Sequence, residues 1–135
     1  MPVLLEHIDA IARKLRRDVL YLEFLRAKPP HREDHKTFES RKLILDWLDG
    51  EGIGWRECAP IASETMMRSY AGEVYLDVPF DRRNALYRKV QAFLEHPDGT
   101  MKFSDVGFYI VPLELAMKNA HHDEPGFWER WAEDF

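Results

Sequence analysis

The stretch Glu73–Phe80 (EVYLDVPF) has the clearest strand pattern in this 135-residue chain. Its apolar and polar side chains alternate, with Val74, Leu76, Val78 and Phe80 on one side and Glu73, Tyr75 and Asp77 on the other. Successive side chains of a strand point to opposite faces of a sheet. We therefore predict a strand with one face in the core and a polar face that a ligand could reach.

Three further segments have strand character: 19–26 (VLYLEFLR), 55–59 (WRECA) and 103–112 (FSDVGFYIVP). In the first of them the side chains again divide into two sets, Leu20, Leu22 and Phe24 against Tyr21, Glu23 and Leu25. The segment 55–59 is the shortest and has the weakest pattern of the four.

Helical patterns separate these strands. One helix should begin near Thr37 as its N-cap and end at the glycine-rich segment 49–54 (DGEGIG). A second should be capped by Asp81 and run to Glu95, before the turn 96–99 (HPDG). The apolar spacing also predicts a helix over Val3–Arg17 and two short helices over Leu113–Ala120 and Pro125–Glu133.

The order of these elements predicts the fold class. The middle six are βαββαβ, the ferredoxin-like order, in which two helices cover one face of an antiparallel four-stranded sheet. The N-terminal and C-terminal helices would pack on an edge or on the other face. Because the second strand is weak, an α+β domain of different topology is the alternative. The length fits one domain over residues 1–135.

Composition excludes several functional classes. A single cysteine, Cys58, rules out an internal disulfide and a cysteine-rich zinc site. The N-terminal segment breaks its apolar run with Glu6 and Asp9, and no run of apolar residues is long enough for a membrane span. We therefore expect a cytoplasmic protein without membrane contact.

Charge is distributed unevenly along the chain. Residues 1–42 carry ten Lys/Arg against seven Asp/Glu, a net charge of +3, whereas residues 43–135 carry nine against seventeen, a net charge of −8. An acidic surface of this kind repels nucleic-acid phosphates and attracts a basic partner. Ordinary solubilising surface charge is the simpler explanation of the same numbers.

Two histidine pairs are candidate metal ligands. His31 and His35 follow two prolines in a loop, where no helix imposes the spacing that chelation needs. His121 and His122 are adjacent, so on a helix their imidazoles would point about 100° apart. We predict neither a metal site nor a cofactor.

Catalytic signatures are equally weak, and no catalytic residue is assigned. Glu73 and Asp77 would lie about 13 Å apart along a strand, too far for a glycosidase pair. Cys58 has no histidine nearby in the sequence, and the segment 49–54 lacks the lysine of a phosphate-binding loop. These observations favour a protein without enzymatic activity.

Two functional hypotheses remain. In the first, a small acidic domain of the inhibitor or immunity type binds a protein partner, or a second copy of itself, through the aromatic residues Phe127, Trp128, Trp131 and Phe135 of the acidic C-terminal segment. The same aromatic residues could instead dock on the sheet as core. In the second hypothesis the protein is a small-molecule-binding domain or a small enzyme, with its site on the polar face of the sheet against Tyr75, Asp77, Tyr109 and Trp55.

Overall fold

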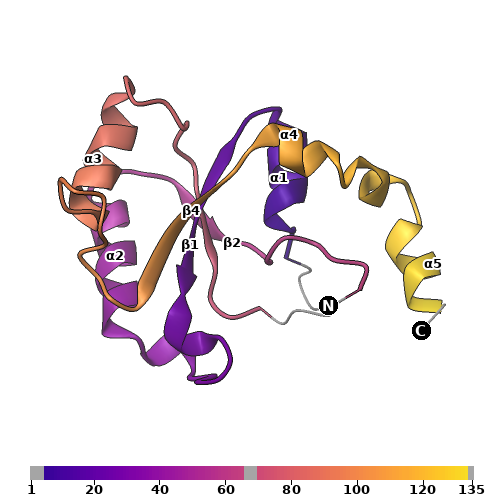
Figure 1. Cartoon of the computed structure of the whole chain (residues 1–135), viewed down its shortest axis with the longest axis horizontal. Coiled ribbons are helices and arrows are strands. Elements are labelled where there is room, and N and C mark those ends of the chain that lie inside the picture. The colour runs from indigo at the N-terminus through magenta and orange to yellow at the C-terminus, as the bar shows by residue number, and fades with distance from the viewer. Residues whose placement is uncertain (1–4, 66–69, 134–135) are drawn as a thin grey trace.

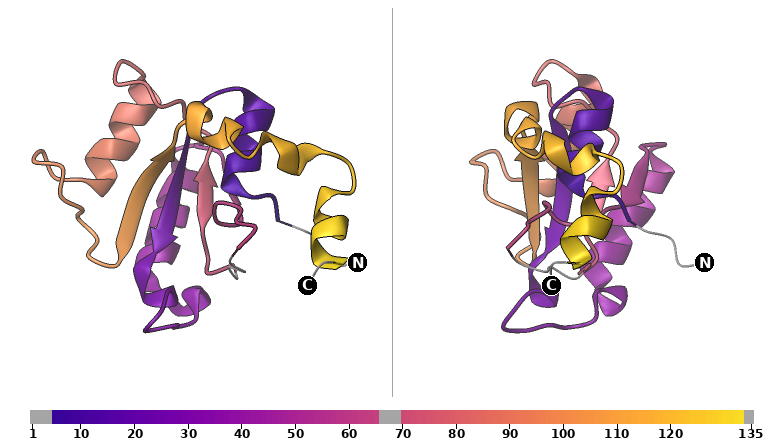
Figure 2. Two further views of the ribbon diagram at one scale, coloured as in Figure 1. Left: turned by 45° about the vertical axis from the view of Figure 1, so that its right-hand side comes forward. Right: turned by 90° about the vertical axis from the view of Figure 1, so that its right-hand side faces the viewer.

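The computed structural model describes residues 5–65 and 70–133 and shows a four-stranded antiparallel sheet with helices on both faces (Figures 1 and 2). The α+β class is thus confirmed. The strands are β1 (Val19–Phe24), β2 (Trp55–Glu57), β3 (Val74–Leu76) and β4 (Val106–Val111). The helices are α1 (Ile8–Leu15), α2 (Glu39–Gly50), α3 (Ala85–Leu94), α4 (Leu113–Met117) and α5 (Phe127–Glu133), with short 3₁₀ turns η1 (Leu25–Ala27), η2 (His35–Thr37) and η3 (Ala120–Asp123).

The strands lie in the order β2-β3-β1-β4. β1 pairs antiparallel with both β3 and β4, and β2 pairs antiparallel with β3. β1 and β2 therefore point the same way with β3 between them, and α2 connects them. The longest pairing joins β1 to β4 over six residues, from Val19↔Val111 to Phe24↔Val106.

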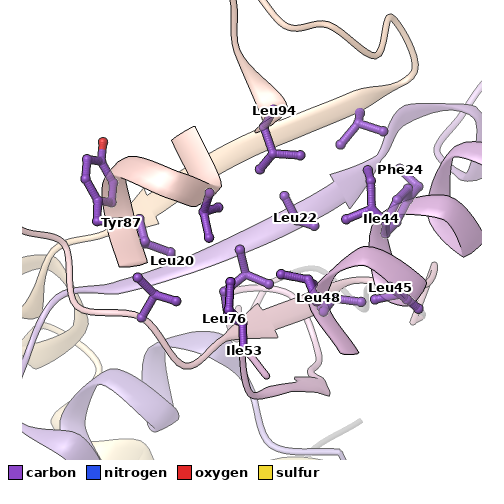
Figure 3. Packing of buried hydrophobic residues seen from close by; sticks show 14 of the residues in the cluster. Leu20, Leu22, Phe24, Ile44, Leu45, Leu48, Ile53, Leu76, Tyr87 and Leu94 are labelled. Atoms are coloured by element: carbon purple, nitrogen blue, oxygen red, sulfur yellow. The ribbon is translucent and has the colours of Figure 1, made fainter. Parts of the chain in front are cut away.

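The face of the sheet beneath α2 and α3 carries the larger apolar cluster (Figure 3). Leu20, Leu22 and Phe24 of β1 all lie there and are buried, as the alternation in the sequence predicts. Ile44 and Leu48 of α2 are buried in the same cluster. Packing of these apolar stripes against the strands is what fixes the two helices on this face.

The opposite face is covered by α1 and α4, on the other side of the sheet in Figure 1. Ile8, Ile11 and Ala12 of α1 pack there against Tyr21 and Tyr75 of the central strands. The prediction of an accessible polar face is therefore wrong for this part of the sheet. The apolar stripe of the first helix is what covers it, and α1 and α4 lie on the other face rather than on an edge.

Several element boundaries also differ from the prediction. α3 begins at Ala85, because the Asn84 side chain accepts hydrogen bonds from the backbone N–H groups of Leu86 and Tyr87, and Asp81 does not cap it. The strand predicted over residues 73–80 pairs only at Val74–Leu76. Among the described residues, no helix is both long and apolar enough to cross a membrane.

Candidate functional site

The C-terminal arm, defined here as residues 120–133, extends away from the sheet. It consists of η3 and α5, and α5 contacts η3 rather than a strand (Figures 1 and 2). None of the described α5 residues is buried. The alternative in which these aromatic side chains dock on the sheet as core is therefore not what the structure shows.

Aromatic and imidazole rings of the arm contact one another and form the aromatic–histidine cluster, whose members are His7, His121, His122, Phe127, Trp128 and Trp131. Trp128 lies at its centre, with ring centroids 5.0 Å from Phe127, 5.4 Å from Trp131 and 4.6 Å from His122. The fourth neighbour, His7, lies 5.5 Å away and comes from the segment before α1. The cluster thus joins the two ends of the described chain.

Glu64 holds this cluster to the loop between β2 and β3. One of its carboxylate oxygens, Oε1, lies 2.8 Å from His121 Nε2 and 3.3 Å from His122 Nε2. The backbone carbonyl of Glu64 accepts a hydrogen bond of 3.0 Å from the indole N–H of Trp131. The hydrogen bond from His121 lowers the pKa of Glu64, as does the second one from His122.

The two adjacent histidines do not point apart as predicted. Their ring centroids are only 4.4 Å apart and meet edge to face. His122 is buried while His121 is exposed, and burial lowers the pKa of His122, with the nearby His121 lowering it further. The Nδ1 atom of His122 is buried without a hydrogen-bond partner among the described residues. The neutral form of this imidazole is therefore favoured.

An open groove of about 450 Å³ lies beside the cluster. Its lining combines two carboxylates, one guanidinium, one imidazole and two aromatic rings: Glu64, Glu124, Arg130, His121, Phe127 and Trp131. Arg130 lies 3.6 Å from Glu124, so its charge is already partly compensated within the arm.

The arm is fixed to the body of the protein by Arg13. This side chain is buried and donates hydrogen bonds from Nε and Nη2, both of 2.8 Å, to the two carboxylate oxygens of Asp123. It also donates to Asp9 within α1 and to the carbonyl of Ala116 in α4. The bidentate pair lowers the pKa of Asp123. It sets the position of η3, and therefore of both histidines.

The residues predicted to bind a small molecule do not form one site. Tyr75 is 4% exposed, and its hydroxyl already accepts a hydrogen bond of 2.9 Å from Arg17. Asp77 is exposed and pairs with the same arginine at 2.6 Å. Tyr109 is exposed on β4, where it packs 5.6 Å from Tyr21.

Trp55 lies on the opposite face of the sheet from Tyr75. It is paired with Leu76, packs against the cluster beneath α2, and donates its indole N–H to Asp49 at 2.8 Å. Of the four predicted partner-binding residues, Phe127, Trp128 and Trp131 do come together, while Phe135 lies outside the described residues.

Glu64 was not predicted from the sequence. It lies in the segment 60–69, which has neither a helical nor a strand pattern, so no periodicity pointed to it. Its role follows only from its contacts with residues 57 and 58 positions further along the chain. Burial raises the pKa of the Cys58 thiol to about 12, which makes it a poor nucleophile.

Comparison with models of known protein families, with curated protein sequences and with solved structures finds no match to this chain.

Proposed function

We propose that this protein is a small non-catalytic binding protein whose C-terminal arm binds a basic segment of a partner protein. The observation that carries the proposal is the position of Phe127, Trp128 and Trp131. They are half-buried on an arm that extends away from the core. Aromatic residues of this size are usually buried in the core of a protein.

The rings have the properties of a binding surface. Their edge-to-face contacts hold Trp128 against Phe127 at 85° and against Trp131 at 84° between planes. Side chains already ordered in this way lose little conformational freedom when a partner binds. Tryptophan is also one of the residue types that most often dominate the binding energy of an interface.

The charge around the rings favours a basic partner. The groove contains the carboxylates of Glu64 and Glu124, and the exposed Glu129 and Glu133 lie on α5 itself. A lysine or arginine of a partner could pair with one of these carboxylates and at the same time contact the face of an indole ring, which attracts cations. The net charge of −8 over residues 43–135 acts in the same direction at longer range.

We further propose that the strand-forming core is ferredoxin-like and serves as the platform for this arm. The sheet order, which from the other edge is β4-β1-β3-β2, supports this assignment, as do the two helices α2 and α3 on one face. With that face already covered, the binding surface is contributed by elements added to the core rather than by the sheet.

The test measures binding of defined peptides by fluorescence anisotropy in the presence of EDTA. A panel of Lys/Arg-rich peptides should bind, more weakly at high salt, while peptides of the same length with Glu in place of the basic residues should not. Trp131→Ala should weaken binding by roughly 30-fold, the size of an interface hot spot. Tyr109→Ala removes an exposed aromatic residue on β4 and serves as the control.

Three results would contradict the proposal: equal binding of basic and acidic peptides, an equal loss in the Tyr109→Ala control, or no binding of any peptide. Thermal unfolding of Trp131→Ala should stay close to that of the wild type. A concentration-dependent dimer that is lost in Trp131→Ala would instead assign the surface to a second copy of the chain.

A further inference from the structure

The structure assigns a site for a divalent transition-metal ion, of the Zn²⁺ type, to Glu64, His121 and His122. Each residue offers one ligand atom, and these atoms all lie within 4.8 Å of one another. Among the described residues this is the group of three that meets the geometric condition for a shared ion.

The distances fit a single ion with small adjustments. Zn²⁺ takes imidazole nitrogens at about 2.0–2.1 Å and carboxylate oxygens at about 2.0–2.2 Å, with tetrahedral geometry. Two such ligands on one ion are then roughly 3.4 Å apart. The observed separations of 2.8 Å and 3.3 Å between Glu64 Oε1 and the two Nε2 atoms are close to that value.

The donor set has the right chemistry. Two imidazoles and one carboxylate are the ligands of several open zinc sites, which keep a fourth position for water or another group. The exposed sides of Glu64 and His121 border the open groove, so the fourth position would face this groove.

The surroundings hold the ligands in place. The ring of His122 is enclosed by Phe127 at 4.8 Å and Trp128 at 4.6 Å between centroids. The bidentate pair between Arg13 and Asp123 fixes the residue that follows His122. These contacts restrict the orientations of the His122 ring before an ion binds, so less conformational freedom is lost on binding.

The metal site does not rest on the proposed function. The ligands belong to one chain, so an ion can bind without a protein partner. The peptide experiment above is performed in EDTA, and the metal experiment below contains no peptide. The two proposals can therefore fail separately.

The experiment titrates untagged, EDTA-treated and dialysed protein with ZnCl₂ by calorimetry, and with CoCl₂ by visible absorption. One ion per chain should bind, and Co²⁺ should show the intense absorption of a four-coordinate site rather than the weak absorption of the hydrated ion. Glu64→Gln and His121→Asn should each weaken Zn²⁺ binding by at least roughly tenfold. Both side chains are exposed, so neither substitution should prevent folding.

His31→Asn is the matched control, since His31 is an exposed histidine of the loop that precedes α2. It should bind Zn²⁺ as the wild type does. The proposal would be overturned if the wild type shows no saturable binding, or if Glu64→Gln and His121→Asn both bind as the wild type does. Circular dichroism of each variant confirms that the comparison is between folded proteins.

Discussion

The two faces of the sheet bury different kinds of side chain. The face beneath α2 and α3 is closed almost entirely by aliphatic and aromatic groups. On the face beneath α1 and α4 the apolar cluster is smaller, and the charged side chains of Asp9, Arg13 and Glu73 are buried beside it. Apolar packing tolerates many arrangements, whereas a buried charge requires a partner in a defined position.

That difference explains how the C-terminal arm is held. Asp9 accepts hydrogen bonds from Arg13, from the Ala62 backbone and from the Asn119 side chain, and so joins α1 to two distant loops. Arg13 continues the network to Asp123 in η3. Directional bonds, rather than the extent of apolar contact, therefore determine where the candidate site lies.

The largest effect should come from breaking this network. Asp9→Ala removes the carboxylate that accepts hydrogen bonds from Arg13, from the Ala62 backbone and from Asn119, and removing one partner of a buried ion pair costs about 3–5 kcal/mol. Urea unfolding monitored by circular dichroism measures the loss. As a control, Asp46→Ala removes an exposed i,i+4 pair with Lys42 and should cost about 0.5 kcal/mol or less. A loss below about 1 kcal/mol for Asp9→Ala would contradict this expectation, because it would show that the ion pair with Asp123 alone compensates the buried charge of Arg13.

The apolar face should respond through packing alone. Leu22 is fully buried between β1 and the helices above it (Figure 3). Leu22→Ala should lower the free energy of unfolding by about 2–5 kcal/mol, because it leaves a cavity among the neighbouring side chains. Leu25→Ala, three residues further on but 40% exposed, should have a much smaller effect in the same assay. Equal losses in the two variants would contradict the assignment of faces.

The beginning of α3 offers a smaller test on the same face. Asn84→Ala removes the acceptor for two backbone N–H groups and should cost about 0.5–2 kcal/mol. Asp81→Ala replaces the residue that sequence patterning selects as the cap, and should cost clearly less. If urea unfolding shows a larger loss for Asp81→Ala than for Asn84→Ala, the helix instead begins at Asp81.

The smallest expected effect is the dependence of stability on pH, and it arises from His35. Burial lowers the pKa of His35, and the charge of Arg41 lowers it further. Between pH 7.5 and about 5.5, across its unfolded pKa of about 6.5, the unfolded chain takes up a proton that the folded chain does not. Stability should therefore fall as the pH falls through this range. His122 acts with the same sign, so the decline should be shallower, not absent, in His35→Gln.

The fold could be predicted from the sequence where one physical period dominates. Alternation placed Leu20, Leu22 and Phe24 in the core correctly, and the strands and α-helices from β1 to β4 occur in the predicted order. The burial of the face predicted to be polar and accessible could not be derived from the sequence, because nothing in the residues around Tyr75 shows that α1 covers it. Burial of a tyrosine depends on a segment more than 60 positions earlier in the chain.

The candidate site was predicted only in part. The aromatic residues of α5 stood out by composition, and three of them lie together. The pairing of His121 with His122 was rejected on helical geometry, yet a 3₁₀ turn and the distant Glu64 bring both imidazoles to one oxygen. Side chains in irregular segments have no period from which their direction can be derived.

The contact between His7 and Trp128 has a consequence for engineering. It brings the segment before α1 close to α5, and two segments that lie close together can be joined by a linker in a circular permutant. A short linker from residue 133 to residue 5, with new ends opened at the exposed turn 97–99, would move both ends to the far side of the molecule in Figure 1. Such a permutant would carry a tag or a fusion partner without crowding the histidines.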